Sequence, residues 1–217
     1  MERILTDDGP GRNAGDSLMS HAVGAPANLR NTPDRYGIVS QSLHWLIVIL
    51  VFVQYLLGIK AHGMPVSLER LMLLARHKSI GVTIFALMIA RLAWRLYSPP
   101  PTLPSNTRTW TAHAAHLSHA LLYLLLLAMP VVGWLLSSAS NLTVSWFGFV
   151  SLPNLIGPNR QAAHWLLFTH QGMAWLLLAT VILHTGAALW HHIVLHDSVL
   201  LRMLPFAALN RKGGDSQ

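Results

Sequence analysis

Four long apolar segments, separated by polar or proline-rich connections, constrain the fold of this chain more than any other feature. They cover residues 43–59, 79–97, 117–136 and 162–191, and each approaches the roughly 20 residues that an α-helix needs to cross a bilayer. The chain is 53% hydrophobic and only 11% charged, which does not suit the surface of a soluble protein. The sequence therefore predicts an all-α integral membrane protein, a four-helix up-down bundle.

Two of these segments contain residues that interrupt a simple apolar run. Arg91 and Arg95 lie at the end of the second segment, where long side chains can extend to the lipid headgroups. Pro130 lies in the third segment, and membrane helices tolerate proline. The connection at 98–108 contains four prolines and is predicted to be non-helical, and the longest loop is predicted at 138–160.

The predicted membrane domain, residues 36–206, lies between two polar ends. Residues 1–35 are rich in Asp, Asn, Gly and Pro and contain no signal-peptide core, so they are interpreted as a disordered cytoplasmic tail. Met19 is an alternative start, because nothing before it has a structural pattern. Residues 207–217 are interpreted as a cytoplasmic C-terminal tail.

Four spans place both termini on one side of the membrane, and the basic residues indicate which side. Of 15 Lys and Arg residues, ten lie on the terminal side: Arg3, Arg12, Arg30, Arg35, Arg91, Arg95, Arg108, Arg202, Arg211 and Lys212. Five lie on the opposite side: Lys60, Arg70, Arg76, Lys78 and Arg160. The positive-inside rule then predicts cytoplasmic termini. The basic residues form no continuous stripe, so the net charge of +7 does not indicate nucleic acid binding.

The chain has no cysteine, which excludes c-type haem attachment, thiolate-bound iron-sulfur clusters and cysteine zinc sites. Any metal chemistry must therefore use His, Met or carboxylates, and 13 histidines are present.

Four of the histidines pair by depth in the predicted bundle. His170 and His184 are 14 positions apart on the fourth segment, so they share a helix face and lie about 21 Å apart along its axis. His44 is level with His184 on the cytoplasmic side, and His77 is level with His170 on the outer side. One histidine at a helix end is commonly an interfacial residue, but two pairs at two depths indicate haem ligands. Two axial imidazoles leave no open coordination position, which favours electron transfer.

The remaining histidines have weaker patterns. His113, His116 and His119 recur every third residue, and they either contact haem propionates, line a polar access route or are interfacial. His191 continues the face of His184 toward the cytoplasm, where a quinone headgroup could accept a hydrogen bond. His164 is a rival to His170, but its 20-residue distance from His184 exceeds a comfortable spacing between two haems.

A basic group on the outer side surrounds His77, and only Glu69 opposes its charge. Its members are Lys60, Arg70, Arg76 and Lys78. The group either anchors lipid headgroups or steers a small anion toward the outer haem.

The order and spacing of several motifs resemble the bacterial cytochrome b561 family over residues 35–206. The motifs are HW at 44, HKSIG at 77, R-x3-R before the prolines, and H-x13-H. They lie within the runs SLHWLIVILVFVQYLLGI, RHKSIGVTIFALMIARLAWRLYSPPP, HAAHLSHALLYLLLLAMPVVGW and HQGMAWLLLATVILHTGAALWHH, the last followed by HDSVLLRMLP. The resemblance implies a multi-pass bacterial inner-membrane protein that binds two haems b, with His44, His77, His170 and His184 as axial ligands.

The resemblance also implies a choice of functions. One type of member oxidises superoxide at the outer face and reduces ubiquinone on the inner side, and we take this superoxide:quinone oxidoreductase activity as the leading hypothesis. Other members are cytochrome subunits that relay electrons for a partner dehydrogenase or hydrogenase. A non-redox, His-lined metal transporter is the third alternative. Gln171 departs from the family, because the residue after the fourth-segment histidine is often acidic.

Overall fold

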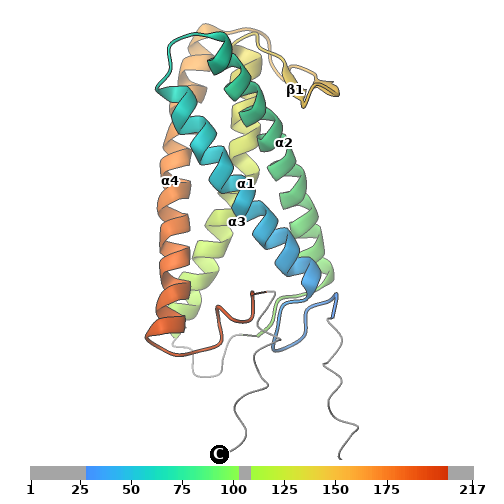
Figure 1. Ribbon diagram of the computed structural model, residues 1–217, viewed down its shortest axis with the longest axis vertical. Coiled ribbons are helices and arrows are strands. Elements are labelled where there is room, and N and C mark those ends of the chain that lie inside the picture. Colours follow the sequence, from blue (N-terminus) through green and yellow to red (C-terminus); the bar gives the residue numbers. More distant parts are fainter. Residues whose placement is uncertain (1–27, 103–108, 205–217) are drawn as a thin grey trace, which may run out of the picture.

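The computed structural model describes residues 28–102 and 109–204 of the chain, and its four long helices form one elongated bundle (Figure 1). The helices are α1 (Ile38–His62), α2 (Leu68–Tyr97), α3 (Thr109–Ala139) and α4 (Arg160–Ile193). All four are long and apolar enough to cross a membrane. The predicted all-α, four-span architecture is therefore confirmed.

The helices pack as two pairs that meet through α2 and α3. α1 packs on α2 and α3 packs on α4, whereas α1 and α4 make no direct backbone contact within the described residues. A side chain links α1 to α4, because the Tyr55 hydroxyl of α1 donates a hydrogen bond to the Ala174 carbonyl of α4. The apolar core, centred on Ile47, Ile84 and Met88, lies where α1, α2 and α3 meet.

The helices extend beyond the apolar segments from which they were predicted. α1 begins at Ile38, and α2 begins at Leu68 after the side chain of Ser67 accepts a hydrogen bond from the Arg70 amide at 3.2 Å. α4 begins at Arg160 after the Asn159 side chain accepts one from the Ala162 amide at 2.9 Å. Side-chain caps start α2 and α4 in polar sequence, so hydrophobicity alone places the first residues of these two helices too late.

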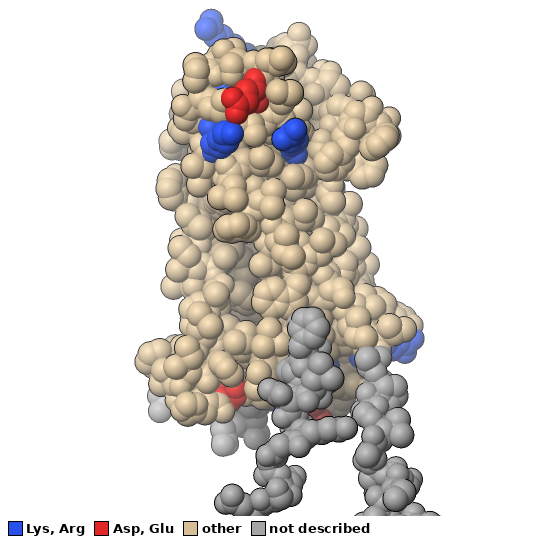
Figure 2. Space-filling view, in the orientation of Figure 1, with Lys and Arg blue, Asp and Glu red and all other residues tan. Residues whose placement is uncertain are grey.

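The surface of the bundle has a broad uncharged belt. Figure 2 shows Lys, Arg, Asp and Glu side chains near the two ends of the bundle, with other residues between them. Large apolar side chains are exposed along this belt, as at Phe52 (65%) and Leu183 (71%). Such exposure suits a surface that faces lipid rather than water.

A β-hairpin marks one end of the bundle, which we call the hairpin end (Figure 1). Its strands, β1 (Val144–Trp146) and β2 (Val150–Leu152), pair antiparallel inside the segment that was predicted only as a long loop. The hairpin is fixed to α2, because Ser79 Oγ donates to the Ser145 carbonyl at 3.0 Å and accepts from the Phe147 amide at 3.0 Å.

The opposite end holds the start of α1 and the end of α4, and we call it the terminal end (Figure 1). Residues 28–35, which belong to the predicted disordered tail, make hydrogen bonds there, including Asn31 to Ser98. Residues 194–204 return from α4 to α1, where the Trp45 indole donates to the Met203 carbonyl at 3.0 Å. The rest of the two predicted tails, at 1–27 and 205–217, lies outside the described residues.

Candidate functional site

Two pairs of histidines face each other inside the bundle at two depths. His44 of α1 and His184 of α4 lie near the terminal end, with ring centroids 6.5 Å apart and ring planes at 73°. His77 of α2 and His170 of α4 lie toward the hairpin end, with centroids 6.2 Å apart and planes also at 73°. The structure thus brings together the pairs that depth predicted, and all four side chains are half-buried.

The ring separations suit a metal ion held between two imidazoles. An imidazole nitrogen binds a transition metal at about 2 Å, so two opposed bonds plus the half-widths of the rings separate the centroids by about 6 Å. Both pairs meet this condition. We call them the terminal-end site (His44, His184) and the hairpin-end site (His77, His170).

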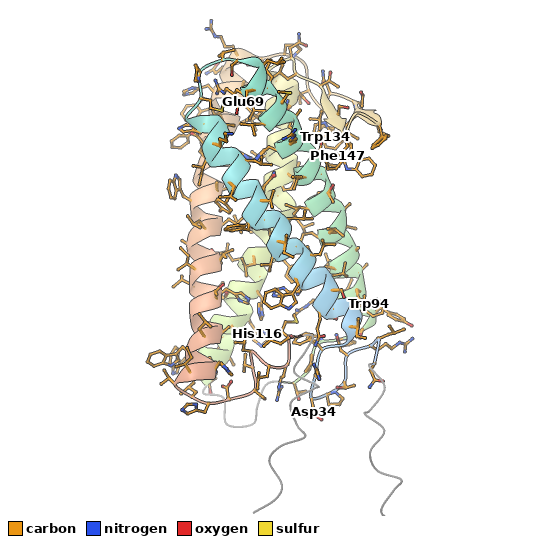
Figure 3. The ribbon with its side chains drawn as sticks, in the orientation of Figure 1. Asp34, Glu69, Trp94, His116, Trp134 and Phe147 are labelled. Carbon is orange, nitrogen blue, oxygen red and sulfur yellow. The ribbon has the colours of Figure 1, made fainter. Side chains whose placement is uncertain are left out.

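A third imidazole approaches the terminal-end site. The His119 ring of α3 lies 5.2 Å from the His184 ring, closer than His44 does. This separation is shorter than the roughly 6 Å that an intervening metal requires. His119 is therefore a neighbour of the site in this geometry, and His44 has the spacing of the opposing ligand. The other two histidines of the stripe, His116 (Figure 3) and His113, are exposed in the first turns of α3, near the terminal end.

The hairpin-end site contains buried polar atoms that lack partners among the described residues. These atoms are His77 Nδ1, His170 Nδ1 and Gln54 Oε1. Buried polar atoms are rarely left unpaired, so this site is arranged for a further group rather than for a closed core.

Glycines on two neighbouring helices lie beside the hairpin-end imidazoles. A Cβ at Gly133 of α3 would lie 3.2 Å from His170 Cε1, and one at Gly58 of α1 would lie 3.4 Å from His77 Cε1. The residues present therefore fit haem: opposed imidazoles at metal spacing, unpaired ring nitrogens, and a glycine that keeps space clear beside the His170 ring.

Replacing Gly133 tests this space. We expect Gly133→Val to displace the His170 ring and to lower haem occupancy of the hairpin-end site, while the terminal-end site stays occupied. Haem content and reduced-minus-oxidised spectra measure the effect. Gly172→Ala on α4 is the control, because a Cβ there meets nothing within 4 Å and should be neutral or stabilise the helix by about 0.5–1 kcal/mol. Full occupancy in Gly133→Val would show that the close approach is unimportant.

The basic group predicted around His77 lies at the hairpin end, but its charges are not equivalent. Lys60 forms an ion pair with Glu69 at 3.0 Å, and both side chains are more than half exposed (Figure 3). Arg70 and Lys78 are half-buried, whereas Arg76 is exposed. The uncompensated charge therefore lies with Arg70, Arg76 and Lys78.

The remaining predicted residues lie away from the two sites. His164 is exposed at the hairpin end beside Trp165, so it does not face His184 or His77. His191 lies beyond His184 at the end of α4, and its Nδ1 pairs with Asp197 Oδ2 at 2.5 Å. Sequence reasoning missed Asp197, because residues 194–204 had no pattern that predicted their return to the bundle.

The comparisons with known proteins agree with this geometry. The model of the prokaryotic cytochrome b561 family matches residues 35–206. The chain belongs to this family. Cytochrome b561 homolog 2 of Escherichia coli (strain K12) is 34% identical over 185 residues, covering 80% of this chain and 93% of the relative. Members of the family bind haem b, so this cytochrome b561 family member is a multi-pass membrane redox protein.

Two further relatives have similar coverage. Cytochrome b561 homolog 1 of E. coli (strain K12) is 30% identical over 174 residues, covering 79% of this chain and 98% of its own. A protein of Yersinia pestis named "Probable superoxide oxidase CybB" is 31% identical over 172 residues, covering 79% of this chain and 96% of its own. The family resemblance drawn from the histidine motifs is thereby confirmed.

Proposed function

We propose that this family member holds two haems b and carries electrons across the bacterial inner membrane, from superoxide on the hairpin side to ubiquinone on the terminal side. Both termini are then cytoplasmic, as the distribution of basic residues predicts. The name of the Yersinia pestis relative supports superoxide as the donor.

The observation that carries the proposal is the presence of two histidine pairs at two depths. α4 supplies one histidine to each pair, and the 14 positions between them place the sites about 21 Å apart along the helix. Haem b held between two imidazoles supplies one-electron chemistry without an open position for oxygen activation. The four histidines would hold the two groups, one near each end of the bundle.

The proposal assigns quinone binding to His191. Asp197 engages its Nδ1, which fixes the ring and leaves Nε2 for a ligand. The Asp197 carboxylate also accepts a hydrogen bond from the Val199 amide at 2.9 Å, so the pair is held by the returning segment. With a proton on both ring nitrogens, His191 donates to the Asp197 carboxylate from Nδ1 and can donate to a quinone carbonyl from Nε2.

We expect His191→Ala to keep both haems and to slow quinone reduction by on the order of tenfold, the effect of losing one charge-assisted hydrogen bond. Stopped-flow oxidation of the reduced protein by a soluble quinone measures the rate. His192→Ala, the adjacent half-buried histidine that has no such acid partner among the described residues, is the matched control. Equal rates in the two variants would return His191 to a merely interfacial role.

Purified protein in detergent tests the whole proposal. An optical spectrum with two low-spin b-type haems per chain establishes the cofactors, and its absence would favour the His-lined metal transporter. Superoxide generated enzymatically should then reduce the haems, and added quinone should reoxidise them. Haem binding without superoxide turnover would favour the alternative function, an electron-relay subunit that requires a partner dehydrogenase.

A further inference from the structure

Two arginines on α2 point into the bundle near the terminal-end site. Arg91 and Arg95 are one helical turn apart and half-buried. Arg91 Nη1 donates to the Ser40 carbonyl of α1 at 3.2 Å. The Arg95 guanidinium lies 5.6 Å from the centroid of the Tyr123 ring of α3. The pair therefore reaches to the two neighbouring helices, and not away from the bundle toward lipid headgroups, as the sequence suggested.

Neither arginine has an acidic partner among residues 28–102 and 109–204. The ion pairs in those ranges are Lys60 with Glu69 and His191 with Asp197. The third acid there, Asp34, is exposed at the terminal end (Figure 3). A charged side chain inside a membrane-spanning bundle costs free energy unless it is paired. Two guanidinium groups that point into the bundle therefore indicate that an anion binds between them.

The anion would lie beside the terminal-end site. The acceptor of Arg91, Ser40, lies four residues before His44 on α1. The ring against Arg95, Tyr123, lies four residues after His119 on α3. Both cations therefore make their contacts about one helical turn from imidazoles at this end, and the described part of the chain supplies no negative charge there.

The surroundings of Arg91 hold it in place. Its acceptor, Ser40, is buried, and the Ser40 hydroxyl donates to Asn31 Oδ1 at 2.7 Å while accepting from the Trp94 indole at 3.1 Å (Figure 3). Asn31 is in turn fixed to the Ser98 carbonyl at 2.7 Å. A guanidinium group that is oriented before its ligand arrives loses less entropy on binding.

We propose that Arg91 and Arg95 bind the propionate carboxylates of the haem at the terminal-end site, an inference that rests on the haem site proposed above. A guanidinium group and a carboxylate form bidentate, charge-assisted hydrogen bonds, and a haem held by His44 and His184 would supply two carboxylates as the anion. The two arginines also stabilise added negative charge on that haem, so they raise its reduction potential and favour electron arrival at the terminal side.

A binding assay with two porphyrins tests the proposal. Full-length protein from haem-limited cells, carrying His170→Ala so that only the terminal-end site is read, is titrated with protohaem and with its dimethyl ester, which has no carboxylates. With the native arginines, the ester should bind about tenfold or more weakly than protohaem. With Arg91→Gln and Arg95→Gln together, this preference should disappear. Arg76→Gln, on the same helix but at the hairpin end, should keep it.

The preference for protohaem over its dimethyl ester, rather than the affinity for either porphyrin, decides the outcome. A purely structural role for the arginines would weaken both porphyrins equally and leave the preference intact, which would overturn the proposal. If the double variant binds neither porphyrin, Arg91→Lys decides instead: it keeps the charge but loses bidentate geometry, so it should reduce the preference without abolishing it, and an unchanged preference would overturn the proposal.

Redox titration of the otherwise native holoprotein gives a second readout. The double variant should lower the midpoint potential of one haem only, the one lost in His184→Ala. The arginines would instead bind lipid phosphate if added anionic phospholipid changed the midpoint potential of this haem in the protein with native arginines and the double variant still preferred protohaem to its ester. That result would overturn the proposal. Both assays are independent of superoxide and quinone turnover, and failure of the chain with native arginines to bind haem would refute the haem site itself.

Discussion

Replacing His184 by alanine is expected to remove the haem of the terminal-end site and to leave the other haem bound. His44→Ala should give the same loss, because the two rings oppose each other at a centroid separation of 6.5 Å. His77→Ala and His170→Ala should both remove the hairpin-end haem instead, since their rings are 6.2 Å apart. One missing axial imidazole leaves an open, weakly held haem, so each variant should retain one haem of two.

Haem stoichiometry and redox titration distinguish these outcomes. The two variants of one site should lose the same spectral component and the same midpoint potential. His164→Ala is the control, because this exposed histidine lies on α4 outside both sites. Different losses from the two variants of one site would show that the pairing is wrong even if the ligands are right.

The same experiment decides the role of His119. Its ring lies 5.2 Å from that of His184, which is too close for an intervening iron. His119→Ala should therefore keep the terminal-end haem bound. If it removes that haem while His44→Ala does not, His119 is the ligand, and binding must rearrange the three rings.

The histidine pairs could be predicted from the sequence because helix geometry alone fixes them. Once four spans are assigned, a 14-residue spacing determines both the face and the depth of His170 and His184, and the alternating direction of the spans sets the level of their partners. The structure adds that α1 and α4 do not pack on each other within the described residues, although they carry the terminal-end pair. Helix-to-helix distances of this kind depend on packing that no local pattern encodes.

Other features depended on contacts between distant segments. Asp197 meets His191 only because residues 194–204 return to α1, and the hairpin is fixed by Ser79, which is 66 residues from its partner Ser145. The sequence predicted that the Arg91 side chain extends to lipid headgroups, because a sequence shows that a residue lies near a helix end but not which way its side chain points. Its bond to Ser40 depends on how closely α1 and α2 approach.

The charges at the hairpin end lead to the second large expected effect, on the rate of reduction by superoxide. Opposite charges near a site concentrate a small anion there, and this steering raises association rates by about tenfold or more and weakens as salt increases. Reduction of the haems by superoxide should therefore slow steeply with ionic strength. Arg76→Gln and Lys78→Gln together should lower the rate by about tenfold at low salt, with an unchanged haem spectrum.

The ion pair between Lys60 and Glu69 supplies a matched control. Because these exposed side chains already neutralise each other at 3.0 Å, replacing both by glutamine removes two charges without changing the net charge of the hairpin end. In that double variant, superoxide should reduce the haems at the native rate. Loss of the uncompensated charges of Arg76 and Lys78 should lower this rate. If the basic group only anchors lipid headgroups, both double variants will react alike and reduction will not depend on salt. In that case, or if superoxide fails to reduce the haems at all, the donor is a protein that docks at this end, and the chain acts as the relay subunit of a larger complex.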